Sequence, residues 1–125
     1  MDENPCQRGL ALFNSGHFFD AHEALEDVWS EAPRHSRRRR HLQGLVQLAV
    51  AFHHQSTGNL VGARSVLERA LRNVEGAEES FPEVDWECLR GCLKPWREYL
   101  AEVRRKAVGS SPPELPKVLL RHQAR

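Results

Sequence analysis

The feature that most constrains the fold is an internal repeat whose two copies lie 42 residues apart. The segment Gly16-His-Phe-Phe-Asp-Ala21 recurs as Gly58-Asn-Leu-Val-Gly-Ala63, and each copy opens a run of apolar residues at helical spacing. A repeat of this length is typical of stacked helical hairpins. A solenoid normally needs three or more copies, so two copies predict a compact bundle rather than a repeat array.

Apolar periodicity predicts an all-α fold, a compact bundle of five or six helices built from helical hairpins. The central helix is expected over about residues 37–56, because its apolar side chains span an arc of roughly 200°, wider than the stripe of a surface helix. The second and fourth helices should pack on it. The expected helices are Pro5–Phe13, His17–Ala32, Arg37–Ser56, a helix from the N-cap Asn59 to near Gly76, and a helix from Trp86 to Val103. In the last of these, apolar residues repeat at alternating spacings of three and four, and Pro95 must kink or split the helix.

The segment Glu75–Glu87 joins the fourth expected helix to the fifth. It contains six acids and no base, which predicts an exposed loop. Beyond the fifth helix, the proline-rich stretch from Gly109 is expected to be extended or irregular. We therefore expect a single helical domain over residues 1–108 and a C-terminal tail over residues 109–125, packed on that domain or extending from it.

Composition narrows the class of protein. The formal net charge of +1 over 125 residues argues against nucleic acid binding through bulk electrostatics. The first five residues lack the basic and apolar regions of a signal peptide, and no stretch approaches the length of a membrane-spanning helix. A cytoplasmic protein without a membrane partner is expected.

The three cysteines indicate reduced thiols, because their number is odd and they form no C-x-x-C motif. They lie at positions 6, 88 and 92. Cys88 and Cys92 are four residues apart on one helical face, which would suit two metal ligands, although small core residues are the more frequent use of such cysteines.

Only the first copy of the repeat carries His22 beside Glu23 and Glu26. Helix packing needs the glycine, alanine and leucine of the repeat but no histidine, so His22 is a candidate functional residue. His22 and Glu26 are four residues apart and project from one side of a helix. With His53 on the central helix they are candidate ligands for a divalent metal, and three ligands plus water would leave a catalytic position open.

Two metal-free alternatives stay open for the same histidines. They are either partly buried hydrogen-bonding side chains, or members of a polar pocket in which His22 and a carboxylate act as an acid/base pair. No serine or cysteine is placed as an evident nucleophile, and the sequence names no reaction, so it does not decide whether the chain is an enzyme. The full candidate pocket comprises His22, Glu23, Glu26, Gln43, Gln47, His53 and His54.

The run Arg37-Arg-Arg-Arg40 is the candidate partner-binding patch, for an acidic surface or for nucleic acid, because clustered guanidinium groups bind phosphates. Alternatively, these four arginines (Arg37, Arg38, Arg39 and Arg40) pair with acids of the chain itself, before Pro33 or in Glu75–Glu87. Two functions therefore compete. One is a pocket that binds a small ligand or metal, and the other is a helical-hairpin interaction module for a protein partner, with a homodimer as a further alternative.

Three segments together resemble the family called domain of unknown function 309: Phe13–Trp29, Leu42–His54 and Gly58–Ala63. The resemblance covers roughly residues 8 to 74. It implies a small all-α prokaryotic protein from a family with no established activity, cofactor or substrate. The family's H-E-x-x-E-x-x-W and L-Q-G-L-x-Q patterns fall on His22, Glu23, Glu26, Trp29, Leu42, Gln43, Gly44, Leu45 and Gln47. The G-x-x-x-x-A spacing is also similar to tetratricopeptide hairpins, where it packs helices together.

Overall fold

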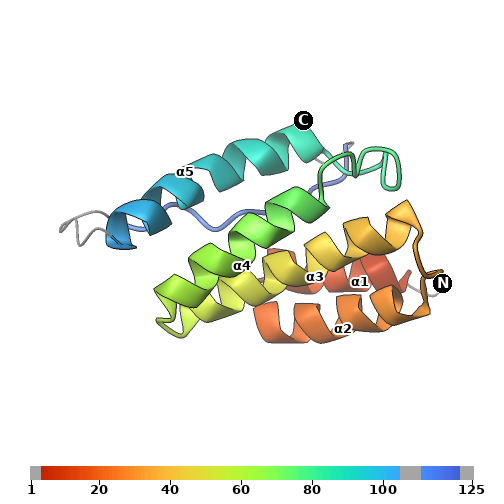
Figure 1. The fold of residues 1–125 in the computed structure, drawn as a ribbon, viewed down its shortest axis with the longest axis horizontal. Coiled ribbons are helices and arrows are strands. Elements are labelled where there is room, and N and C mark those ends of the chain that lie inside the picture. The colour runs from red at the N-terminus through yellow and green to blue at the C-terminus, as the bar shows by residue number, and fades with distance from the viewer. Residues whose placement is uncertain (1–3, 105–110, 122–125) are drawn as a thin grey trace.

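Five helices follow one another in the computed structural model, which describes residues 4–104 and 111–121 (Figure 1). They are α1 (Pro5–Asn14), α2 (Phe18–Glu31), α3 (Arg37–Ser56), α4 (Leu60–Asn73) and α5 (Trp86–Arg104). Within the described residues there is no strand, only an isolated antiparallel bridge between Val84 and Leu120. The expected all-α bundle is confirmed. None of the described helices has the length and apolar character needed to cross a membrane.

The order of packing follows the order of the chain. α3 packs against both α2 and α4, while α1 packs on α2 and α5 on α4 (Figure 1). Gly16 and Gly58, the repeated glycines, occupy the tight turns before α2 and α4 with φ of +82° and +86°. Glycine adopts this left-handed conformation without steric cost. The repeat therefore encodes two similar hairpin turns, and α3 is the central helix as expected.

Side-chain caps set the beginnings of three helices. Asn4 accepts a hydrogen bond from the Cys6 backbone N–H at 2.8 Å, directly before α1. Ser36 accepts one from Arg39 N–H at 3.1 Å at the start of α3. Asn59 accepts one from Gly62 N–H at 3.0 Å, which confirms it as the N-cap of α4. Each bond satisfies a donor that a helix start leaves without an intrahelical partner.

An aromatic cluster at the centre of the core joins α1, α2, α3 and α5. The ring centroids of Phe13 and Phe18 lie 5.2 Å apart, and those of Phe18 and Phe52 5.7 Å apart. Phe52 also meets Trp96 of α5 edge-on at 5.1 Å. All four side chains are buried. Aromatic rings bury large apolar areas and favour such edge-on contacts, so this cluster fixes the relative positions of four helices.

The expectation that Glu75–Glu87 forms an exposed loop is only partly correct, because part of this connection is buried. Ala77, Phe81 and Val84 are buried there, with exposed fractions of 0%, 2% and 2%. The segment is a series of turns, and the indole Nε1 of Trp86 donates to the Phe81 carbonyl at 2.8 Å. The acids of this segment include exposed Glu75, Glu78 and Glu79, while its apolar side chains point into the core. A charge count alone misses this alternation.

Pro95 does not split the last helix, since α5 runs as one helix from Trp86 to Arg104. A proline inside a helix leaves the carbonyl four residues earlier without its usual donor. Here that carbonyl belongs to Gly91, which is exposed, so water can hydrate it. The helix therefore continues on its buried face while the missing hydrogen bond lies toward solvent.

Residues 111–121 form an irregular segment that lies along the bundle. The Asn14 side chain donates to the Val118 carbonyl at 2.9 Å and accepts from Val118 N–H at 2.7 Å. Trp96 Nε1 donates to the carbonyl of Glu114 at 2.8 Å, and Asp85 N–H to that of Leu119 at 2.8 Å. The division into a domain over 1–108 and a tail over 109–125 stays a prediction, and residues 1–3, 105–110 and 122–125 lie outside the described residues.

Candidate functional site

A shallow pocket of about 160 Å³ opens between the first half of α2 and the second half of α3. Phe19, His22, Val50 and His53 line it, and these four residues are called the imidazole pocket below. Phe19 is 52% exposed and its ring lies near both imidazoles, with its centroid 5.8 Å from that of His22 and 5.4 Å from that of His53. The packing of α2 against α3 thus brings together two histidines that are 31 positions apart in the sequence.

Glu26 fixes the orientation of His22. Its Oε2 atom lies 3.1 Å from Nε2 of the imidazole, one helical turn along α2, as the spacing predicted. The His22 side chain is 25% exposed and that of Glu26 54% exposed, so the pair sits at the rim of the pocket. In the neutral tautomer with hydrogen on Nε2, His22 donates to this carboxylate and keeps Nδ1 as a hydrogen-bond acceptor. The pair thus holds an acceptor at a fixed place beside an apolar surface.

The other candidate pocket residues point elsewhere. Glu23 lines a different groove, of about 440 Å³, between α1 and α2. Gln47 accepts a hydrogen bond from Asn73 of α4 at 2.8 Å, and Gln43 is exposed. His54 Nδ1 lies 3.3 Å from the side-chain nitrogen of Asn59 at the turn before α4. Of the seven candidates, the structure therefore brings together His22, Glu26 and His53.

Metal binding by His22, Glu26 and His53 gains no support from their geometry. Across residues 4–104 and 111–121, no group of three or more His, Cys, Asp or Glu side chains is arranged so that it could hold a metal ion. Glu26 is engaged with Nε2 of His22, which leaves only Nδ1 of this imidazole without that partner. The arrangement suits a hydrogen-bonding pocket better than a coordination site.

The first two arginines of the run at the start of α3 contact the segment between α4 and α5. The Arg37 guanidinium donates to both carboxylate oxygens of Glu79, at 2.8 and 3.0 Å, so the expected pairing with an acid of Glu75–Glu87 is found here. The Arg38 guanidinium lies 4.5 Å from the centroid of the Phe81 ring. Both contacts are local ones that hold this segment against α3.

The last two arginines of the run also contact the chain itself. Arg39 stacks on the Trp29 ring at 4.2 Å and donates to the Ala32 carbonyl at 2.8 Å. Arg40 donates to the Arg72 carbonyl near the end of α4 at 2.6 Å. These contacts stabilise the ends of α2 and α4. Partner binding by Arg37–Arg40 remains a prediction.

His41 is a polar residue that the sequence interpretation did not single out. It is 2% exposed, and its Nδ1 lies 2.6 Å from the Ser80 hydroxyl oxygen. Burial lowers the pKa of His41 below its ordinary value, and a hydrogen bond to the Glu75 backbone only partly offsets this effect. His41 falls on the same helical face as Leu45 and Phe52, a spacing that would have predicted its burial.

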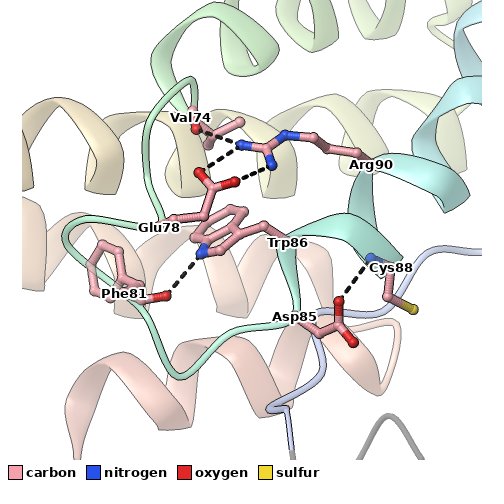
Figure 2. A network of polar contacts seen from close by, with 7 residues as sticks. All are labelled: Val74, Glu78, Phe81, Asp85, Trp86, Cys88 and Arg90. Atoms are coloured by element: carbon pink, nitrogen blue, oxygen red, sulfur yellow. Dashed lines mark hydrogen bonds and ion pairs between the residues drawn. The ribbon is translucent and has the colours of Figure 1, made fainter.

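A second polar network joins the α4–α5 connection to α5 (Figure 2). Arg90 contacts both carboxylate oxygens of Glu78, at 2.5 and 3.0 Å, and its side chain also reaches the Val74 carbonyl at 3.4 Å. The hydrogen bond from Arg90 lowers the pKa of Glu78 to about 2. Beside it, Asp85 accepts from the Cys88 backbone N–H at 2.9 Å and caps α5. The network anchors the α4–α5 connection to the start of α5.

Comparison with known proteins agrees with the motifs. Over 67 residues, which are 54% of this chain, it is 31% identical to the uncharacterized protein YpuF of Bacillus subtilis (strain 168). Over 103 residues, or 82% of this chain, it is 30% identical to an uncharacterized protein of Aquifex aeolicus (strain VF5). The matched stretches cover 38% and 28% of these two relatives, so the chain corresponds to about a third of their length.

The family match is confined to the first part of the chain. The model of the family described as Domain of unknown function (DUF309) matches residues 6–66, which contain the whole imidazole pocket and end within α4. The names of the family and of both relatives give no activity. The resemblance seen in the motifs is confirmed, because residues 6–66 match the model of the DUF309 family.

Proposed function

We propose that this chain is a binding protein whose imidazole pocket takes the apolar end of a small amphipathic ligand carrying a primary amine. The observation that supports this most directly is the convergence of His22 and His53, from two helices, on one hollow beside the exposed Phe19 ring. A mainly apolar hollow with a few placed polar groups is the usual form of a small-molecule site.

The size of the pocket limits the ligand. At about 160 Å³ the pocket is smaller than the sites of drug-sized molecules, which occupy about 300–1,000 Å³. It has room for one ring or one branched aliphatic group. Phe19 and Val50 supply the apolar contact, and the imidazoles of His22 and His53 supply hydrogen-bond acceptors at its edge.

Charge favours an amine over a carboxylate. α2 carries five acids and no lysine or arginine, and one of those acids, Glu26, is hydrogen-bonded to His22 at the rim of the pocket. A positive ligand would meet this carboxylate and the face of the Phe19 ring, and cations are attracted to aromatic faces. An anionic ligand of the same shape would be repelled by the same group.

Titration of ¹⁵N-labelled protein with phenethylamine tests the proposal. We expect chemical-shift changes that centre on Phe19, His22 and His53. Replacing either histidine (His22→Ala or His53→Ala) should weaken binding at least about tenfold, or ~1.4 kcal/mol. His17→Ala is the matched control, because His17 is exposed and its side chain makes no capping hydrogen bond at the start of α2.

Two results would contradict the proposal. One is equal binding of 3-phenylpropanoate, which has a similar ring and chain but the opposite charge. The other is near-stoichiometric metal in protein purified without chelator that is lost in His22→Ala, because that would make His22 a metal ligand. Elemental analysis by inductively coupled plasma mass spectrometry measures the second.

A further inference from the structure

Two thiols lie side by side on α5, outside the imidazole pocket and outside the segment that matches the family. Cys88 and Cys92 are one helical turn apart, so their side chains project from the same flank of the helix. Both residues are half-buried free cysteines. In Figure 2 the Cys88 side chain points away from the Glu78–Arg90 pair, which occupies the other flank.

The spacing of one helical turn places the two thiols beside each other. The pKa of Cys88 is raised first by burial, then by the charge of Cys92 and that of Asp85, and also by a hydrogen bond with Cys92. These effects on the pKa of Cys88 agree with the helical spacing, which places Cys92 one turn away on the same flank of α5. Cys6 differs from this pair because it is buried in the core contributed by α1.

Because the site offers only two thiols, it suits a metal ion that needs only two ligands. Zinc in proteins takes four ligands, or three and a water, and no third His, Cys, Asp or Glu joins the pair among the described residues. Thiolates select soft ions, of which Cu(I) is the common biological example. Cu(I) is also stable with only two thiolate ligands in a linear arrangement.

We propose that Cys88 and Cys92 form a two-coordinate site for Cu(I). On binding, each thiol releases one proton to solvent and its sulfur forms one bond to copper, so a bis-thiolate complex with one negative charge results and no electron is transferred. Cys88 is the third residue of α5, and the N-terminal end of a helix favours negative charge.

The test is an anaerobic titration of the full chain, reduced and freed of reductant, with Cu(I) in competition with the chromophoric chelator bicinchoninate. One ion should bind per chain. Either Cys88→Ser or Cys92→Ser should lower the affinity at least tenfold, because a single thiolate cannot complete the linear site. Cys6→Ala is the matched control and should keep the wild-type affinity, and far-ultraviolet circular dichroism of each variant checks that it is folded.

Three results would contradict the proposed copper site. Retained affinity in both single serine variants would show that the ion binds elsewhere. Two ions per chain would show that the thiols act separately. One ion per two chains, with a dimer in sedimentation velocity, would make copper a link between chains. None of these results affects the amine proposal, since Cys88 and Cys92 take no part in the imidazole pocket.

Discussion

His41 and His53 occupy the same helix but meet different surroundings. His41 is enclosed and hydrogen-bonded to Ser80, whereas His53 is half-buried at the edge of the imidazole pocket. The first holds the α4–α5 connection against α3, and the second keeps a surface that a ligand can reach. The same residue type thus supports the fold at one end of α3 and offers binding chemistry at the other.

Acid should weaken the fold through His41. Burial keeps the folded-state pKa below the ordinary value of 6.5, so just below pH 6.5 the unfolded chain takes up a proton that the folded chain does not. This contribution to stability is present above pH 6.5 and is lost as the pH falls toward the folded-state pKa. The loss can reach about 1.4 kcal/mol per pH unit. Urea unfolding between pH 7.5 and pH 5 measures it.

The matched variants for this prediction are His41→Gln and His17→Gln. The first should lower stability at pH 7.5, since it removes the imidazole that bonds Ser80, and should flatten the pH dependence. The second should keep the wild-type slope, because His17 is exposed. A wild-type slope in His41→Gln would assign the acid effect to another group.

At the scale of helices, close approach between α3 and α4 depends on Gly44. A methyl group at this position would lie 3.0 Å from the Val74 backbone nitrogen and 3.1 Å from the Asn73 carbonyl carbon, and backbone atoms cannot move aside cheaply. Gly44→Ala should therefore lower the free energy of unfolding by about 1–3 kcal/mol. Gly91→Ala on α5 is the control, because nothing lies within 4 Å of the added methyl group.

The control should change stability in the opposite direction. Alanine loses less backbone entropy than glycine when a helix forms, so Gly91→Ala should raise the free energy of unfolding by roughly 0.5–1 kcal/mol. Urea unfolding at pH 7 measures both variants. Equal effects of the two substitutions would mean that helix propensity, and not contact between α3 and α4, governs position 44.

The Glu78–Arg90 pair should contribute only modestly at neutral pH. Both side chains are partly solvated, 56% and 39% exposed, and exposed ion pairs stabilise proteins by about 0–1 kcal/mol. Glu78→Gln should thus cost under about 1 kcal/mol at pH 7. The loss should vanish in acid as the pH approaches the Glu78 pKa of about 2. Glu87→Gln is the exposed control, and a pH-independent difference between the two variants would contradict this account.

Helices were the part of the fold that the sequence predicted well. The range 37–56 matches α3 because Ser36 caps it and its wide apolar arc requires burial on several sides. The α4–α5 connection was missed because its many acids hid the inward positions of Phe81 and Val84. Local charge counts carry no information about contacts with residues far along the chain.

The candidate site was predicted only in part, for a geometric reason. Spacing along α2 predicts that His22 meets Glu26, and it does. Which residues of α3 face α2 depends on how the two helices are rotated against each other. That rotation places His53 by Phe19 but turns Gln47 toward α4. A single sequence without the packed structure does not specify how α2 and α3 are rotated against each other.

At the scale of the whole molecule, Asn14 connects α1 to the irregular segment 111–121. Its side chain makes two hydrogen bonds with the Val118 backbone, and the Val118 side chain is buried. Asn14→Ala leaves both backbone groups without these partners and should lower the free energy of unfolding by about 1–3 kcal/mol. Ser15→Ala, which removes an exposed hydroxyl, should change it by less than about 0.5 kcal/mol.

Urea unfolding followed by tryptophan fluorescence measures both variants, and proteolysis under native conditions tests the same contact more locally. In Asn14→Ala, cleavage within residues 111–121 should become faster while the helices stay protected. Equal cleavage rates in the two variants would show that other contacts hold this segment in place.

The bond between Asn14 and Val118 spans 104 positions of the chain. A ribosome makes the chain from its N-terminus, so α1 leaves the exit tunnel long before the segment that completes its surroundings has been translated. α1, α2 and α3 can form their mutual contacts during synthesis, because they are neighbours in sequence. The last step of native folding must wait until Val118 has left the tunnel, so a ribosome that stalls earlier would display a chain whose first helix still lacks this partner.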